Sequence, residues 1–197
     1  TAGAPGTLWF TLANAWPSGG PTYIGRITTS GNFTFFEVPA PGCVNIYPVD
    51  IAYGSDGNIW FADGCVYAID RITPSGVFTT FPLPQGVTPS ALVTGPNGDL
   101  WCSCSGYVGE ITTEGVLKKL FRLSMGSFTI TNGPCRKVYV LEYDGYSYSM
   151  AEVTTSGSFT EYALPPNDSD LAIAAGPDKK IWIVGEVLQK FDPVTHI

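Results

Sequence analysis

A sequence pattern recurs five times along this chain. Each copy contains a glycine-bearing turn, an aliphatic residue and an aromatic residue, and the aromatic residues are Trp9, Trp60, Trp101, Tyr139 and Trp182. These residues are 51, 41, 38 and 43 positions apart. A second marker is the set of glycines Gly31, Gly76, Gly115 and Gly157, which are 45, 39 and 42 positions apart. Two markers that share a period of roughly 42 residues indicate a chain built from repeated units.

Each period contains four short segments with strand character. In the second copy they are residues 49–53, 58–62, 66–73 and 77–83, separated by turn residues such as glycine and proline. Four antiparallel strands repeated every roughly 40–50 residues are typical of a β-propeller. We therefore predict an all-β chain with a single domain at 1–197. Its blades are expected at approximately 1–48, 49–90, 91–127, 128–170 and 171–197.

The number of segments leaves the closure of the propeller open. Nineteen segments can be counted; the last copy lacks its outer strand, and the first copy starts at its innermost strand, Thr1-Ala2-Gly3. The chain is therefore either five blades in a closed ring or part of a larger propeller. We expect the closed ring, and we keep a filament or oligomer as an alternative because bare blade edges invite pairing.

Composition excludes several classes of protein and partner. The 23 glycines and 16 prolines argue against long helices, and 44% hydrophobic residues argue against disorder. The longest apolar runs are shorter than the roughly 18 residues of a membrane span, so we expect no membrane insertion. The net charge of -7 repels phosphate backbones, so we expect no nucleic acid partner either.

The motifs within the repeat resemble one known family. Gly95-Pro96-Asn97-Gly98-Asp99-Leu100-Trp101 and the segment 23–31 are similar to the blade motifs of the virginiamycin B lyase (streptogramin lyase) family. This resemblance implies a propeller over essentially the whole chain. It also implies a lyase that opens a cyclic peptide lactone with histidines, a glutamate and a divalent metal at the channel mouth.

The catalytic positions implied by the resemblance are mostly filled by other residues. The histidine positions hold Val49, Ser90, Phe128 and Leu171, and the glutamate positions hold Leu12, Asp63, Cys104, Glu142 and Gly185. The only histidine, His196, is the penultimate residue. Acid–base catalysis by imidazoles cannot be assembled from it alone. We therefore predict no catalytic residues, no cofactor and no metal.

The five cysteines allow one predicted disulfide. Cys43 and Cys65 lie in loops expected at the same end of the propeller, so we hypothesise that they pair. Cys102 and Cys104 point the same way on a strand, which suits packing or a strained bond. Cys135 lies in a turn at the opposite end and should be free or intermolecular.

One end of the propeller is the candidate contact surface. The insertion 13–21 carries Trp16, which lies outside the repeat pattern, and we expect it to lie near the other candidate contacts: Tyr47, Asp63, Glu142, Asp168 and Asp170. Such a surface could contact a small ligand, a sugar, a peptide or another protein subunit. Alternatively, Trp16 covers its own blade. Asp168 and Asp170 alone provide too few oxygen atoms for calcium.

These observations favour a non-catalytic, secreted or cell-surface propeller that acts as a binding or structural module. One alternative is a lyase or hydrolase that uses Asp63 and Glu142 with a metal. The other is a scaffold or filament subunit that assembles with copies of itself.

Overall fold

The computed structural model describes residues 1–12, 21–39, 48–64, 67–165, 172–185 and 188–195. These residues form eighteen strands in five antiparallel sheets, and their only helix is the 3-10 turn Pro134–Arg136. The prediction of an all-β propeller is therefore confirmed. The strands are β1 (Thr7–Leu12), β2 (Tyr23–Thr28), β3 (Phe33–Glu37), β4 (Pro48–Tyr53), β5 (Ile59–Asp63), β6 (Ala68–Ile72), β7 (Phe78–Pro82), β8 (Pro89–Thr94), β9 (Leu100–Cys104), β10 (Tyr107–Ile111), β11 (Leu117–Arg122), β12 (Gly126–Gly133), β13 (Lys137–Tyr143), β14 (Tyr148–Thr154), β15 (Phe159–Ala163), β16 (Ala172–Ala175), β17 (Ile181–Val184) and β18 (Leu188–Phe191).

The five sheets are successive blades, which we number from the N-terminus. Blades 2, 3 and 4 have four strands each, and blades 1 (β1–β3) and 5 (β16–β18) have three. The segment expected to be the innermost strand of blade 1 makes one isolated bridge, Ala2 with Leu8. Thr1 also exchanges main-chain hydrogen bonds with Trp9 at 2.8 and 2.9 Å. This segment therefore lies where the repeat places it, but it is too short to count as a strand.

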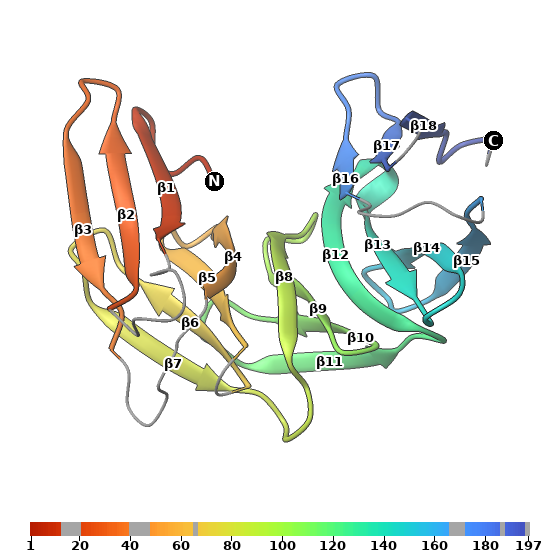
Figure 1. Ribbon diagram of the computed structural model, residues 1–197, viewed down its shortest axis with the longest axis horizontal. Helices are drawn as coiled ribbons and strands as arrows, with labels where there is room; N and C mark the ends of the chain where they lie inside the picture. Colours follow the sequence, from red (N-terminus) through yellow and green to blue (C-terminus); the bar gives the residue numbers. More distant parts are fainter. Residues whose placement is uncertain (13–20, 40–47, 65–66, 166–171, 186–187, 196–197) are drawn as a thin grey trace.

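The blades follow one another along an arc (Figure 1). The innermost strands of blades 2 to 5 contact one another in succession, from β4 through β8 and β12 to β16, and β1 of blade 1 contacts β4. Blades 1 and 5 stand apart at the two ends of the arc (Figure 1). The closed ring of five blades that we expected is thus not formed within the described residues, because the sheets at the two ends of the arc do not pack against each other.

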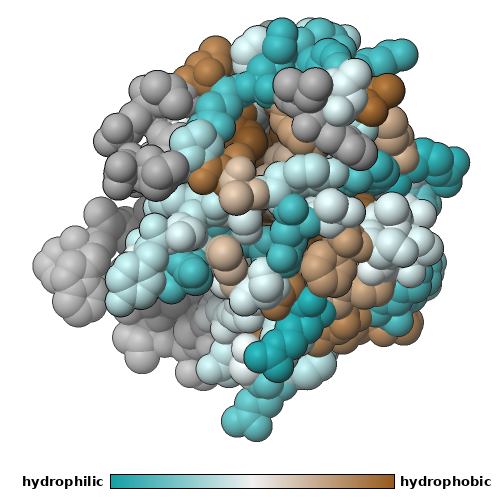
Figure 2. Space-filling view, turned by 90° about the vertical axis from the view of Figure 1, so that its right-hand side faces the viewer, coloured by the Kyte–Doolittle hydropathy of each residue, from teal (hydrophilic) through white to brown (hydrophobic). Residues whose placement is uncertain are grey.

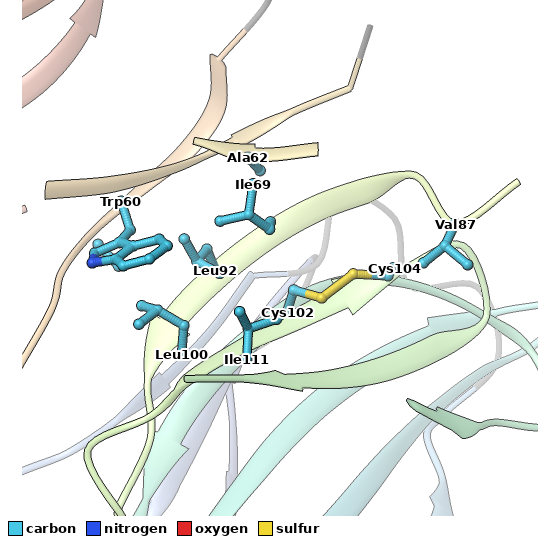
Figure 3. Packing of buried hydrophobic residues seen from close by; sticks show 10 residues of the cluster. Trp60, Ala62, Ile69, Val87, Leu92, Leu100, Cys102, Cys104 and Ile111 are labelled. Atoms are coloured by element: carbon cyan, nitrogen blue, oxygen red, sulfur yellow. A yellow bond between two sulfur atoms is a disulfide. The ribbon is translucent and has the colours of Figure 1, made fainter. Parts of the chain in front are cut away.

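The aromatic residue of each repeat packs between blades. Trp60 and Trp101 are completely buried, and Trp60 lies against Leu92 and Leu100 of the next blade (Figure 3). A buried indole N–H needs an acceptor. Asn97 provides it for Trp101 at 3.0 Å, and the aspartates four residues before Trp60 and Trp182 provide it at 3.2 and 3.1 Å. The Asp or Asn of the repeat is therefore the hydrogen-bond partner of its tryptophan.

A glycine two residues before this Asp or Asn allows the indole to lie close to the main chain. A Cβ atom on Gly95 would lie 2.2 Å from Cδ1 of Trp101, and one on Gly54 would lie 2.7 Å from Cδ1 of Trp60. Real Cβ atoms essentially never approach another atom so closely, so any larger residue would displace the ring. The glycine is thus explained by packing.

Basic side chains connect one blade to the next. Arg26 of blade 1 donates to the Pro74 carbonyl oxygen of blade 2 at 3.1 Å, and Arg71 of blade 2 donates to the Thr113 carbonyl oxygen of blade 3 at 3.1 Å. In blade 3 the donor is Lys119, which donates to the carbonyl oxygen of Thr155 in blade 4 at 2.7 Å. Lys119 lies on the outer strand β11, whereas Arg26 and Arg71 lie on β2 and β6, one strand further in. The connection is therefore kept although the residue that makes it changes.

The outer surface is largely polar where it can be seen. The side of the molecule at the right of Figure 1 is mostly hydrophilic, with separate hydrophobic groups between the polar ones (Figure 2). Among the described residues, no helix is long and apolar enough to cross a membrane.

Candidate binding surface

The predicted contact residues fall into two groups. Asp63 and Glu142 are described by the structure, at the ends of β5 and β13. Trp16, Tyr47, Asp168 and Asp170 lie outside the described residues, as do Cys43 and Cys65 of the hypothesised disulfide. The roles given to those six residues stay predictions.

Asp63 belongs to a buried pair of carboxyl groups. Strand alternation puts it on the same face as Ile59 and Phe61, which pack on Trp9 of blade 1. Its partner is Asp70 on β6, whose pKa is raised to about 6, first by burial and then by the charge of Asp63 and a hydrogen bond with it. A hydrogen bond with Thr80 opposes this rise in pKa. Asp70 therefore keeps its proton to a higher pH than an ordinary aspartate does, beside Asp63 in the interface between blades 1 and 2.

Glu142 is buried in a different interface. It lies on the face of β13 that also carries Val138 and Val140, which pack on blade 3. Its Oε2 accepts a hydrogen bond from Ser149 Oγ at 3.0 Å, and the Met125 main chain also bonds to it. Burial raises the pKa of Glu142, and the nearby charge of Glu161 adds to the rise.

The position equivalent to Asp63 and Glu142 in blade 3 is Cys104. It forms a disulfide with Cys102, and the two sulfur atoms lie inside the interface between blades 2 and 3 (Figure 3). The sequence analysis allowed either packing or a disulfide bond for Cys102 and Cys104, and the structure shows the disulfide bond. Cys135 is exposed and forms no disulfide with a described cysteine.

The described positions given to the family's histidines hold residues without an acid or base group. Val49 is exposed. Ser90 lies 3.0 Å from Ser103, oxygen to oxygen, and Phe128 packs edge-on against Tyr148 with ring centroids 6.1 Å apart. None of the three can take up or release a proton near neutral pH. The fourth position, Leu171, lies outside the described residues.

The divalent metal that the family resemblance implies does not fit the described residues. Three or more histidine, cysteine, aspartate or glutamate side chains never come together in this part of the chain in a way that could hold a metal ion. Asp63 and Glu142 also face separate interfaces, so they cannot share one ion. No chemical step through a metal is therefore derived from these residues.

A cleft of about 460 Å³ lies between blades 3 and 4, beside Glu142. Residues 105–107 and Arg122 of blade 3 line one side, residues 123–126 line the floor, and Tyr143 and Asp144 of blade 4 line the other side. The sequence analysis named Glu142 but missed its neighbours. The available signal was the cluster of three tyrosines within six positions, Tyr143, Tyr146 and Tyr148, whereas the corresponding hairpins of blades 2 and 3 have one tyrosine each, Tyr67 and Tyr107.

The fold and its inter-blade packing define a β-propeller. The chain belongs to the virginiamycin B lyase family, whose model matches residues 1–184. No curated protein matches it in sequence.

Among solved structures, the chain is similar to virginiamycin B lyase from Staphylococcus aureus, with 23% identity and a TM-score of 0.77 over 95% of this chain and 72% of that one. A streptogramin B lyase is 25% identical, with a TM-score of 0.74 over 89% of this chain and 66% of that one. A protein of unknown function from Bacteroides caccae is 13% identical, with a TM-score of 0.69 over 96% of this chain and 70% of that one. The chain thus spans about two thirds to three quarters of these proteins.

Proposed function

We propose that this chain is a non-catalytic binding or structural module, secreted or at the cell surface. The observation that carries the proposal is the burial of its two remaining acidic positions. Asp63 and Glu142 are 2% and 0% exposed, and they face different blade interfaces. A histidine-to-alanine variant of the Staphylococcus aureus lyase, solved with quinupristin, is catalytically inactive. The lack of histidine at the equivalent positions of this chain supports the same outcome here.

Incubation with quinupristin tests the non-catalytic role. The protein is incubated with the compound, with and without divalent cations, and ring opening is followed by chromatography with the Staphylococcus aureus lyase as positive control. We expect no opening above the rate without protein. Opening that disappears in Glu142→Gln would instead establish the lyase alternative, because this variant keeps the shape of the side chain and removes its ability to ionise.

The disulfide between Cys102 and Cys104 supports the secreted or cell-surface location, since disulfides persist mainly in oxidising compartments. Mass spectrometry of the natural protein under non-reducing conditions tests this point. Two free thiols at these positions would count against the location.

The assembling scaffold remains a second candidate because blade 1 has an apolar exposed face. Leu8, Phe33 and Phe35 are all exposed on the side turned away from blade 2. Exposed apolar groups gathered on one face often mark contacts between proteins. Sedimentation as a single 21.0 kDa species at all concentrations would exclude this candidate. Association that is lost in Phe35→Ser and kept in Phe159→Ser, an exposed phenylalanine of blade 4, would support it.

A further inference from the structure

We propose that the cleft between blades 3 and 4 binds a saccharide chain. In this site Tyr143 stacks on a sugar ring, and Arg122 and Asp144 hydrogen-bond its hydroxyl groups. The inference rests on the proposed binding role and names the class of ligand and its site.

Tyr143 is held as a rigid platform at the edge of the cleft. Its ring stacks on Tyr148 with centroids 4.4 Å apart, and its hydroxyl group donates to the Gly145 carbonyl oxygen at 2.6 Å. Although it is restrained on both sides, 39% of the residue stays exposed. A side chain that is already fixed loses little conformational entropy when a ligand binds.

The platform extends beyond the cleft through a second tyrosine. Tyr146 is 91% exposed and lies in the turn of the same hairpin as Tyr143. Its main chain is fixed because Asp144 Oδ1 accepts hydrogen bonds from the N–H groups of Tyr146 and Ser147, both at 2.8 Å. Two neighbouring tyrosines suit a ligand with more than one ring.

The two sides of the cleft carry a donor and an acceptor that are available to a ligand. The side chain of Arg122 forms no hydrogen bond or ion pair with any described residue, which leaves the donors of its guanidinium group available to a ligand. The main-chain hydrogen bonds to Asp144 lower the pKa of its carboxyl group, so it stays ionised. Only its Oδ1 is used within the described structure, which leaves Oδ2 as an acceptor. A donor facing an ionised acceptor suits hydroxyl groups, which both donate and accept.

The charge of the cleft favours a neutral ligand. One positive and one negative side chain line it, and the whole chain has a net charge of -7, which repels polyanions. A strongly apolar ligand fits poorly too, because Leu123 of the floor is buried and presents little surface. A sugar ring combines an apolar face for the tyrosine with a rim of hydroxyl groups for Arg122 and Asp144.

Titration with defined oligosaccharides tests the proposal. The probes are cellohexaose, xylohexaose, mannohexaose and chitohexaose, each added up to about 10 mM and followed by calorimetry, since single protein–sugar sites often bind weakly. We expect at least one probe to bind. Tyr143→Ala should weaken that binding at least tenfold, and Arg122→Ala and Asp144→Asn should each weaken it severalfold.

Tyr67→Ala is the matched control. Tyr67 is 41% exposed in the corresponding hairpin of blade 2, and its removal should leave the affinity unchanged. Thermal unfolding of each variant verifies that it is folded.

Three results would overturn the inference. If no probe binds the intact protein, the ligand class is wrong. If folded Tyr143→Ala and folded Tyr67→Ala lose the same amount of affinity, the site is wrong while the binding role stands. The same holds if neither variant loses any affinity. Opening of quinupristin, in contrast, would contradict the non-catalytic role whatever the sugar titrations show.

Discussion

The same position of the repeat has opposite environments in blades 1 and 3. Leu8 and Leu100 both directly precede the tryptophan of their blade, yet Leu8 is 57% exposed and Leu100 is 0% exposed. The difference is the preceding blade, which covers Leu100 and has no counterpart over Leu8 among the described residues. In a repeat protein, therefore, the burial of a residue depends on its neighbouring unit as much as on its own.

The comparison extends to polar residues at the end of the same strand. Leu12 of blade 1 is exposed, whereas Asp63, Cys104 and Glu142 at the equivalent positions are buried. The interior interfaces thus enclose the more polar residues and leave an apolar one outside. Enclosed carboxyl groups make the interior interfaces sensitive to pH, while the open face of blade 1 has no such group at this position.

The largest expected effect compares the two leucines directly. Leu100→Ala should lower the free energy of unfolding by about 3 kcal/mol because it leaves a cavity between blades. Leu8→Ala should lower it by less than about 1 kcal/mol, since little apolar surface is lost from the interior. Urea unfolding of both variants measures the difference. Equal losses would show that the face of blade 1 is covered in solution.

The buried carboxyl pair gives the next largest effect. The folded protein holds the pKa of Asp70 at about 6, above its ordinary value of 3.8, so it favours the protonated form. Stability should therefore fall as pH rises from 4 to 6, and Asp70→Asn should remove this loss. We expect the variant to be more stable than the natural chain by about 1–2 kcal/mol at pH 7.5 and by little at pH 4. A gain in melting temperature that is the same at both pH values would contradict this account.

A smaller effect compares two turn glycines with the same backbone conformation. Gly31 and Gly115 both have φ of +83°, but a Cβ atom on Gly115 would lie 1.8 Å from the Phe81 ring of blade 2, and one on Gly31 would meet nothing within 4 Å. Alanine should cost about 1 kcal/mol at either position because of the positive φ. Gly115→Ala should cost about a further 1 kcal/mol for displacing the ring. Chemical denaturation of the pair isolates this packing contribution.

The smallest effect concerns a strained turn in blade 5. Lys179 has φ of +61°, at the turn position that glycine occupies in blades 2 and 3. Lys179→Gly should therefore stabilise the chain by about 0.5–1 kcal/mol, while Gly98→Lys should destabilise blade 3. Melting temperatures that move in the same direction for both substitutions would argue against backbone strain as the cause.

Much of the fold could be predicted because the residues of the repeat are required by local turns and by contacts between neighbouring strands. Each recurring feature of the pattern satisfies a constraint within one blade or between two adjacent blades. Gly95 leaves room for the Trp101 ring, Asn97 accepts a hydrogen bond from its indole, and the turn glycines allow a positive φ. The open arc could not be predicted in this way. It depends on the angle between whole sheets, and no single residue encodes that angle.

The candidate surface was less predictable for two physical reasons. Strand alternation shows that Asp63 and Glu142 share a face with apolar residues, but only the packed structure shows that another blade covers that face. Of the tyrosines of the β13–β14 hairpin, Tyr146 lies in the turn, where side chains are free of the repeat period, and Tyr143 and Tyr148 are the strand residues on either side of that turn. Only the packed structure shows that Tyr143 lines a cleft between blades 3 and 4.

The basic side chains that link successive blades have a consequence for how such chains can change in length. Arg26, Arg71 and Lys119 each donate to a main-chain carbonyl oxygen of the following blade. Every residue has a carbonyl oxygen, so the receiving blade needs no particular side chain at that point. Gene duplication can therefore add a blade, or recombination remove one, without a matching mutation to restore this link.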